Sequence, residues 1–269
     1  MRFGCQTYSW QMSLGEYRGK LNHMTAVAAE AGFQGFEAET IVLTPNWSGT
    51  SLRRSLQAVG LDLAALCLVG SWSNNHETPE ELDLSDRVMD ALATFPDPLI
   101  NLVVLPGTDR SELRARQTAA MSCMSDIARR AQARGITVSF HPNSPPGSIF
   151  RIRSDYDLLM DELDPLIGWT PDSGHLTAGG MDCVWALRKW GDRVRYVHVK
   201  DRAADGGWAP TGTGVVDIPG IIETLEDIGY DGWITFEDES PLAERDPDTA
   251  VRLTGEYVHR LRGQENATL

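Results

Sequence analysis

The sequence predicts an α/β protein that folds as one (β/α)8 barrel. Short apolar or β-prone runs, which indicate strands, alternate with amphipathic runs, which indicate helices. The centres of the expected strands recur roughly every 30 to 37 residues. Eight strand–helix units of this length suit a closed barrel, because an open doubly wound sheet more often has about five to seven strands. No charge run or low-complexity linker divides the chain, so residues 1–269 are expected to form a single TIM-barrel domain.

The strands of the predicted barrel are short and end near polar residues. They are expected at residues 2–7, 35–39, 61–69, 100–105, 136–141, 167–171, 194–199 and 233–237. The second strand ends in Glu37 and Glu39, which are two positions apart and therefore share a face of the strand. One or both of these carboxylates are expected to point into the barrel mouth, and Glu37 is preferred because it follows Phe36 directly.

Helices are expected after the strands, at residues 18–31, 51–59, 79–93, 111–134, 154–163, 181–190, 218–228 and 247–262. The glycines 32, 60 and 135 are typical stop signals after a helical run. Thr78 and Pro79 have the form of an N-cap and first helical residue, and Ser111 is expected to cap the long helix that follows it. The segment 8–10 and the Pro-rich segment 142–147 are predicted to be loops.

Composition narrows the class of function. The formal net charge is −14, which repels phosphate backbones and anionic membrane surfaces, so neither nucleic acid nor a membrane is an expected partner. The four cysteines are widely spaced without a CxxC pair, and the N-terminus lacks the form of a signal peptide. We therefore expect free thiols in a cytoplasmic protein. Whether the protein is a homo-oligomer stays open.

Four of the predicted strands end in residues that bind metals. The ends of the fifth to the eighth predicted strand offer His141, Asp172, His198 and Glu237. The carboxyl ends of parallel strands meet at one end of a barrel, where ligand chemistry gathers. Imidazole and carboxylate together suit a divalent metal of the Mn, Fe, Co or Zn kind better than a purely oxygen-liganded site. Each residue alone would more often be a hydrogen-bonded polar cap, but four at matching places predict a shared metal site.

Such a site favours chemistry next to a carbonyl group. Coordination positions beyond four remain for water or for two oxygens of a bidentate substrate such as a hydroxyketone. A metal on the carbonyl and hydroxyl oxygens acidifies the C–H bond between them and stabilises the enediolate. Glu237 and His141 are therefore candidate catalytic residues as well as ligands.

Further polar residues lie close to these positions in the sequence. His175 either hydrogen-bonds a substrate hydroxyl or caps a helix, and Lys200 either neutralises an oxyanion or forms a surface ion pair of little energetic value. Both are predicted as catalytic residues. Arg151 is a candidate for binding a substrate carboxylate or phosphate, with a solvated position as the alternative.

Two tryptophans and one carboxylate complete the predicted substrate site. Trp10 and Trp208 fall in loops at the predicted rim, where an aromatic face can stack on a sugar ring. Packing in the core or in a lid is the default role of such tryptophans. Glu37 is the third predicted substrate-binding residue in this group.

Several motifs resemble the xylose-isomerase-like TIM-barrel superfamily of sugar isomerases and epimerases. They are Pro171–His175, Val197–Asp201, Gly212–Pro219 and Gly229–Glu237, with a looser match at Gly32–Glu37. Within this superfamily the chain is similar to inosose dehydratases and to hydroxypyruvate- or ketose-epimerase-like members. The resemblance implies one divalent cation, Mn first and Co, Fe, Zn or Mg as alternatives, held at positions 141, 172, 198 and 237.

The resemblance also implies the substrate class and the reaction. Epimerases of the family carry Glu where this chain has His141, so the pair of opposed carboxylates that exchanges protons is broken here. The expected function is therefore dehydration of a keto-sugar or keto-cyclitol through an enediolate, with a histidine as proton donor to the leaving group. The alternatives are a ketose 3-epimerase or hydroxypyruvate-type isomerase, a zinc TIM-barrel endonuclease, and a non-catalytic sugar-binding protein.

Overall fold

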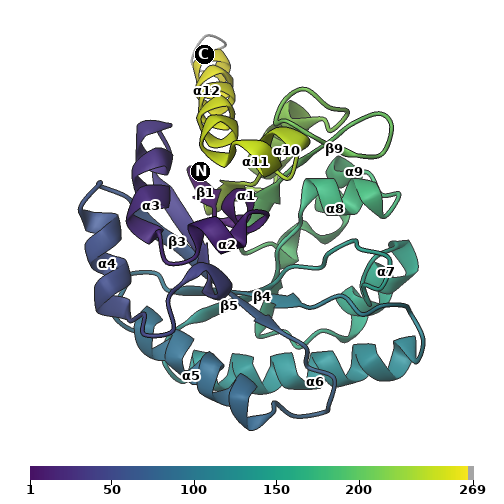
Figure 1. The fold of residues 1–269 in the computed structure, drawn as a ribbon. Coiled ribbons are helices and arrows are strands. Elements are labelled where there is room, and N and C mark those ends of the chain that lie inside the picture. The colour runs from purple at the N-terminus through teal and green to yellow at the C-terminus, as the bar shows by residue number, and fades with distance from the viewer. Residues whose placement is uncertain (266–269) are drawn as a thin grey trace.

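Eight parallel strands form the centre of the structure, a computed structural model that describes residues 1–265, and helices surround them (Figure 1). The strands are β1 (Arg2–Gln6), β2 (Gly35–Glu39), β3 (Asp62–Gly70), β4 (Leu99–Val104), β5 (Thr137–Phe140), β6 (Ile167–Trp169), β7 (Val197–Val199) and β10 (Trp233–Phe236). Each lies within one or two residues of its predicted position, except that β7 begins three residues later than expected.

The strand order closes the sheet into a barrel. Hydrogen-bonded neighbours run β6-β5-β4-β3-β2-β1-β10-β7, so β6 and β7 are the two outer strands. Bridges between Trp169 and Val194 and between Asp172 and His198 join these two edges. The amide of His198 donates to the carbonyl of Pro171 at 2.9 Å, which continues the ladder across the gap. The predicted (β/α)8 TIM barrel is confirmed.

All eight predicted helices are present, and four short helical segments accompany them. The helices are α1 (Tyr8–Gln11), α2 (Leu14–Tyr17), α3 (Leu21–Glu30), α4 (Gly49–Gln57), α5 (Pro79–Leu92), α6 (Leu113–Gln132), α7 (Arg153–Glu162), α8 (Ser173–Ala178), α9 (Cys183–Trp190), α10 (Ile218–Asp227), α11 (Pro241–Arg245) and α12 (Pro247–Glu265), with 3-10 turns η1 (Thr40–Val42) and η2 (Gly191–Arg193). The additional segments are α1, α2, α8 and α11. A small hairpin of β8 (Asp201–Arg202) and β9 (Trp208–Ala209) lies in the Gly-rich loop after β7.

Local sequence chemistry explains where several helices begin and end. Thr78 caps α5 as predicted: its hydroxyl accepts from the amide of Glu81 at 3.2 Å, and Glu81 accepts in return from the amide of Thr78 at 2.9 Å. The prediction for Ser111 is wrong. The helix begins at Leu113, and Ser111 instead donates to Asp109. The predicted loop at 8–10 is also wrong, because Tyr8 to Gln11 form one helical turn.

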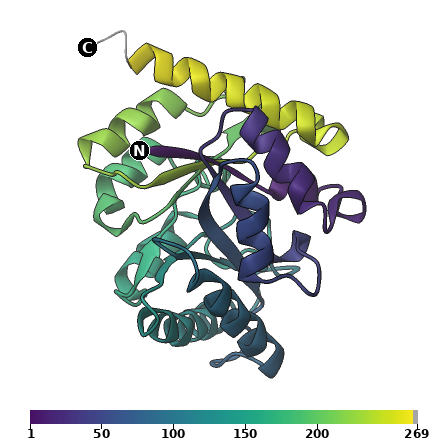
Figure 2. The same cartoon turned by 90° about the vertical axis from the view of Figure 1, so that its left-hand side faces the viewer.

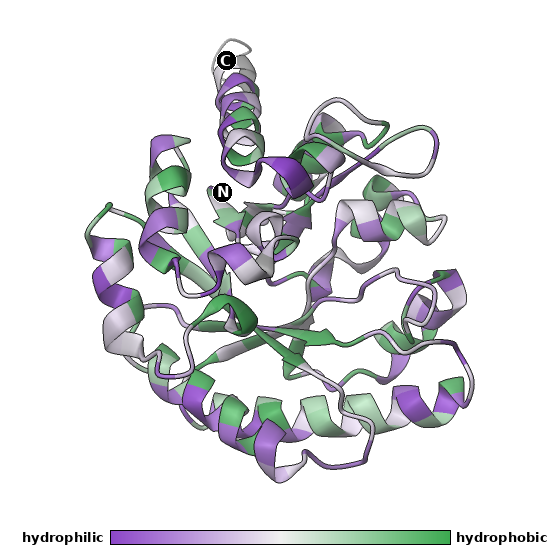
Figure 3. Cartoon of the chain, in the orientation of Figure 1, coloured by the Kyte–Doolittle hydropathy of each residue, from purple (hydrophilic) through white to green (hydrophobic). Residues whose placement is uncertain are grey.

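The apolar residues face inward between the strands and the helices. The strands are mainly hydrophobic, and the outer helices alternate apolar and polar stripes along their length (Figure 3). The last helix, α12, packs along α3, so the C-terminal helix contacts the N-terminal part of the chain (Figure 2). All four cysteines are buried free thiols, as predicted. Within residues 1–265, no helix is both long enough and apolar enough to cross a membrane.

Candidate active site

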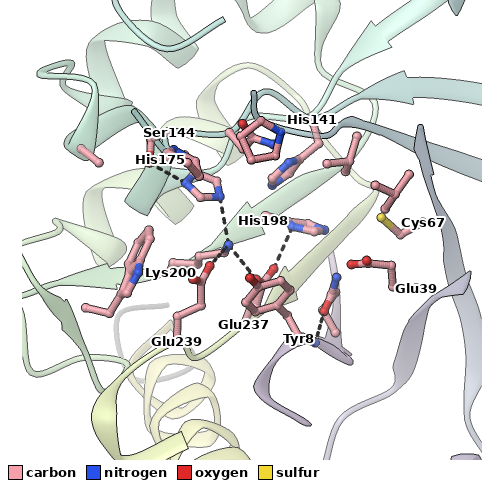
Figure 4. A pocket seen from close by; sticks show the side chains of 18 of the residues that line it. Tyr8, Glu39, Cys67, His141, Ser144, His175, His198, Lys200, Glu237 and Glu239 are labelled. Carbon is pink, nitrogen blue, oxygen red and sulfur yellow. Dashed lines mark hydrogen bonds and ion pairs between the residues drawn. The ribbon is translucent and has the colours of Figure 1, made fainter. Parts of the chain in front are cut away.

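A cavity of about 380 Å³ opens at the carboxyl ends of the strands, where a site was predicted. Its volume lies within the usual range for small-molecule sites. The cavity is lined by seven of the predicted site residues: His141, Arg151, His175, His198, Lys200, Trp208 and Glu237. Figure 4 shows that the imidazoles, Lys200 and Glu237 point toward a common centre.

Three predicted metal ligands form a buried group at this centre. His141, Asp172 and His198 each offer a ligand atom, and these atoms all lie within 4.8 Å of one another. The Nε2 atom of His141 is 3.3 Å from Oδ2 of Asp172, and Nδ1 of His198 is 3.9 Å from the same oxygen. The fourth predicted ligand, Glu237, places Oε2 3.4 Å from Nδ1 of His198. The structure thus brings all four residues together.

The donor atoms of this group fit a divalent cation. Nδ1 of His198 and Nδ1 of His141 are buried and have no hydrogen-bond partner among the described residues. A buried polar atom without a partner costs free energy, unless a ligand or ion satisfies it. Two imidazoles and two carboxylates are a common donor set for transition metals.

Glu37 fixes the orientation of the His198 ring from the side that faces away from the cavity. Oε2 of Glu37 lies 2.6 Å from Nε2 of His198, so the other ring nitrogen, Nδ1, faces the cavity. Asn101 and Tyr196 also donate to the Glu37 carboxylate, at 2.9 and 3.0 Å. Glu37 is fully buried and lies behind His198 rather than on the cavity wall, which differs from its predicted contact with substrate.

The charges around His198 favour a positive charge at this position. Burial lowers the pKa of His198, but the carboxylates of Glu37 and Glu237 outweigh this effect and raise the pKa to about 10. Burial also raises the pKa of Glu237, yet the charges of Lys200 and His198 lower it to about 2. Glu237 is therefore a carboxylate at neutral pH.

Lys200 is a buried cation and not part of a surface ion pair. Its Nζ lies 2.6 Å from Oε1 of Glu237 and 3.7 Å from Oδ2 of Asp172, and it also contacts Glu239. Burial lowers the pKa of Lys200, but these three carboxylates raise it well above its ordinary value. The ammonium group therefore holds Glu237 in place and partly neutralises the cluster.

His175 lies at the start of α8 beside Lys200. Oδ1 of Asp172 accepts from the amide of His175 at 2.7 Å, so Asp172 caps this helix while Oδ2 faces the imidazoles. The His175 ring is 2.8 Å from the hydroxyl of Ser144 and 3.1 Å from Nζ of Lys200. Burial and the charge of Lys200 hold the pKa of His175 well below its ordinary value, so the ring is neutral.

Glycine at position 174 allows the close packing of this wall. A Cβ atom there would lie 2.6 Å from the ring of Trp208 and 2.7 Å from Cβ of Lys200. Trp208 lines the cavity, and the centroids of the Trp208 and His175 rings are 5.4 Å apart. Arg151 also lines the cavity and donates to the carbonyl of Ser144 at 2.8 Å.

Trp10 lies away from the predicted substrate site. Its side chain is fully buried, its indole nitrogen donates to Asp248 at 2.8 Å, and its ring packs near Phe36. It does not line the cavity. Its position corresponds to the default role of core packing rather than to the predicted contact with substrate.

Sequence reasoning missed other residues of the cavity wall. These include Gln6, Tyr8, Ser144 and Glu239. Glu39 is the last residue of β2, and the strand carries it two positions beyond Glu37 on the same face. Burial raises the pKa of Glu39 to about 7. The pairing of Glu37 and Glu39 predicted that one or both would reach the barrel mouth, and Glu39 rather than the preferred Glu37 lines the cavity.

The sequence of residues 25–256 matches the family model of the xylose isomerase-like TIM barrel. The chain belongs to this family. It is 30% identical to an inosose dehydratase of Geobacillus kaustophilus (strain HTA426) over an alignment of 294 positions that covers 97% of this chain and 94% of the relative.

Solved structures share the fold of this family member. A D-allulose 3-epimerase from Methylomonas sp. has a TM-score of 0.74 at 20% identity, covering 97% of this chain and 98% of the epimerase. An IOLI protein described with a bound zinc atom has a TM-score of 0.77 at 15% identity, again over 97% of this chain and 98% of the other. At such identities these two likenesses concern the fold.

Proposed function

We propose that the protein is a metal-dependent lyase that removes water from a keto-cyclitol or keto-sugar through an enediolate. The observation that carries this proposal is the convergence of His141, Asp172, His198 and Glu237 at the cavity floor. The similarity to an inosose dehydratase over almost the whole chain supports both the substrate class and the lyase reaction.

The four converging residues would hold one divalent metal ion. A zinc atom in a structure of the same fold supports a metal at this place, and Mn is the metal that the family resemblance favours. When bound, the cation supplies the charge that holds the substrate carbonyl and hydroxyl oxygens and stabilises the enediolate.

Glu237 is the candidate general base. It is a carboxylate at neutral pH, and it lines the cavity with Oε1 held 2.6 Å from Nζ of Lys200. It would take the proton from the carbon next to the carbonyl group. Lys200 and the neutral imidazole of His175 lie on the same wall, where the ammonium group of Lys200 can donate a hydrogen bond to a substrate oxygen.

Dehydration is favoured over epimerisation by the residue at position 141. Inversion at a carbon centre needs one group to remove a proton and another to return it from the opposite face. The resemblance implies that epimerases of the family use a second glutamate at this position, whereas this chain has an imidazole that lies 3.3 Å from Asp172. A ketose 3-epimerase or a hydroxypyruvate-type isomerase is the alternative.

Two measurements test the proposal. Metal analysis of the purified protein is expected to find about one divalent ion per chain. A panel of inososes and keto-sugars in D₂O, followed by NMR with added Mn, Co, Zn or Mg, is expected to show exchange of the C–H next to the carbonyl and loss of water. Glu237→Gln should slow the exchange by about 10²-fold or more.

The exposed Glu226→Gln, on α10, serves as the matched control and should exchange at the wild-type rate. Exchange with an inverted product and no loss of water would identify an epimerase. No exchange across the panel with any of the metals would contradict the enediolate mechanism.

A further inference from the structure

The proposed reaction needs a proton for the leaving hydroxyl group, and the histidines do not suit this task. His175 is neutral, and both of its ring nitrogens are engaged, one with Ser144 and the other with Lys200. His141 belongs to the group of candidate metal ligands. These contacts point to an acid from another part of the cavity wall.

Glu39 has the position that such an acid requires. It is contributed by β2, which is separated from β7 by β1 and β10, and its side chain faces the cavity. In Figure 4 it lies across the pocket from His175 and Lys200 and beside His198. A substrate over the cavity floor would thus have the Lys200 wall on one side and the Glu39 carboxyl on the other.

The contacts of Glu39 leave one oxygen available to a substrate. Oε2 accepts from Nε2 of Gln11 at 3.0 Å, and no hydrogen bond joins Oε1 to another of the described residues. The backbone amide of Glu39 donates to Thr7 at 3.0 Å, which fixes the end of the strand. Gln11 thus orients the carboxyl group without a positive charge beside it.

The surroundings of Glu39 also favour its protonated form. Burial raises its pKa to about 7, and the charges of Glu237 and Glu37 act in the same direction against the lowering effects of Gln11 and Lys200. Burial likewise raises the pKa of Glu239, another acid of the wall, to about 7, but the Glu239 carboxyl group is in direct contact with the ammonium group of Lys200. A neutral carboxyl group is what a general acid needs.

We propose that Glu39 is the general acid that protonates the leaving hydroxyl group, an assignment that rests on the lyase function proposed above. Glu237 removes the proton next to the carbonyl, and the electrons of that C–H bond form the enediolate. As the C–O bond at the neighbouring carbon breaks, the Glu39 proton moves to the departing oxygen and water is released. Glu39 becomes a carboxylate, Glu237 a carboxylic acid, and exchange with solvent restores both.

The variant Glu39→Gln separates this role from binding and from folding. The amide keeps the shape of the side chain and can still form hydrogen bonds, but it has no proton to give to the leaving group. With an inosose substrate and added Mn, elimination is expected to fall about 10²-fold or more. Exchange of the C–H proton with D₂O, which needs only Glu237, should stay within about threefold of wild type.

A substrate analogue with fluorine in place of the leaving hydroxyl provides the decisive comparison. Fluoride departs without a full proton transfer, so the analogue should restore elimination by Glu39→Gln to within about tenfold of wild type. A merely structural role predicts no such rescue. Glu39→Asp keeps an acid and should retain measurable elimination, while the exposed Glu16→Gln is the matched control.

The possible results are distinct. Unchanged elimination in Glu39→Gln, or equal losses of exchange and elimination without rescue by fluoride, would overturn the assignment of Glu39 and leave the enediolate chemistry intact. Absence of exchange and elimination in the wild-type protein would overturn the proposed function and this assignment with it.

Discussion

Replacing Glu37 by glutamine should weaken metal binding although Glu37 does not face the cavity. Its carboxylate accepts hydrogen bonds from His198 at 2.6 Å, from Asn101 at 2.9 Å and from Tyr196 at 3.0 Å. Glutamine has only one oxygen, so its amide nitrogen must face at least one of these donors. The His198 ring then keeps at most a neutral amide oxygen in place of the carboxylate that directs Nδ1 toward the metal site.

The size of the effect follows from these contacts. Removal of a partner that orients a metal-bound histidine typically costs about 10- to 100-fold in metal affinity, which is roughly 1.4 to 2.7 kcal/mol. A buried donor left without an acceptor costs about 1–3 kcal/mol of folding stability in addition. We therefore expect Glu37→Gln to bind Zn or Mn at least about tenfold more weakly and to unfold at lower urea concentration.

Titration of the metal-free protein against a chromophoric chelator would measure the affinity. Tyr196→Phe is the matched control, because it removes one hydrogen bond from the same carboxylate and leaves the contact with His198 in place. This control should lose stability with little change in metal affinity. Equal metal affinity of Glu37→Gln and wild type would refute the reasoning, as would an equal loss in both variants.

Three other predictions concern stability. Asp201→Ala should lower the free energy of unfolding in urea by about 2–4 kcal/mol, because the carboxylate accepts from the amides of residues 202, 212, 214 and 216 in the loop after β7. Since burial raises the pKa of Glu39 from 4.5 to about 7, folded protein keeps a proton that the unfolded chain releases in this range. As the pH rises from 4.5 to 7, the free energy of unfolding of the wild type should therefore fall by about 3 kcal/mol relative to that of Glu39→Gln. Denaturant titrations at several pH values measure this difference, and a difference that does not change with pH would contradict the prediction. Zn at about 100 times its Kd should stabilise the wild type by about 2.7 kcal/mol in thermal unfolding but not His198→Ala.

The positions of the candidate ligands were predictable because they depend on topology alone. Parallel strands of a closed barrel place their carboxyl ends together, so an ionisable residue that ends such a strand reaches the same cavity. His141 and Glu237 directly follow β5 and β10, and His198 lies within the short strand β7. Asp172 lies three residues beyond β6, and the bridge between Asp172 and His198 brings it to the site.

The alternation of side chains along a strand does not predict how deep in the barrel each side chain lies. Glu37 and Glu39 share a face of β2, and the alternation cannot say which one reaches the cavity. The structure places Glu37 behind His198 and Glu39 at the cavity wall. Trp10 was misjudged for a related reason, because the segment around it forms the helical turn α1 and turns the indole toward Asp248.

The charges at the cavity floor explain why one cluster can suit both a proton and a metal ion. Lys200 contacts Asp172, Glu237 and Glu239, and His198 lies against Glu37 and Glu237. One ammonium group does not balance these carboxylates, so a further positive charge is stabilised beside them. A proton on His198 supplies it in one state, which agrees with the pKa of about 10. A divalent ion at Nδ1 would supply it in the other, so the metal must displace that proton in order to bind.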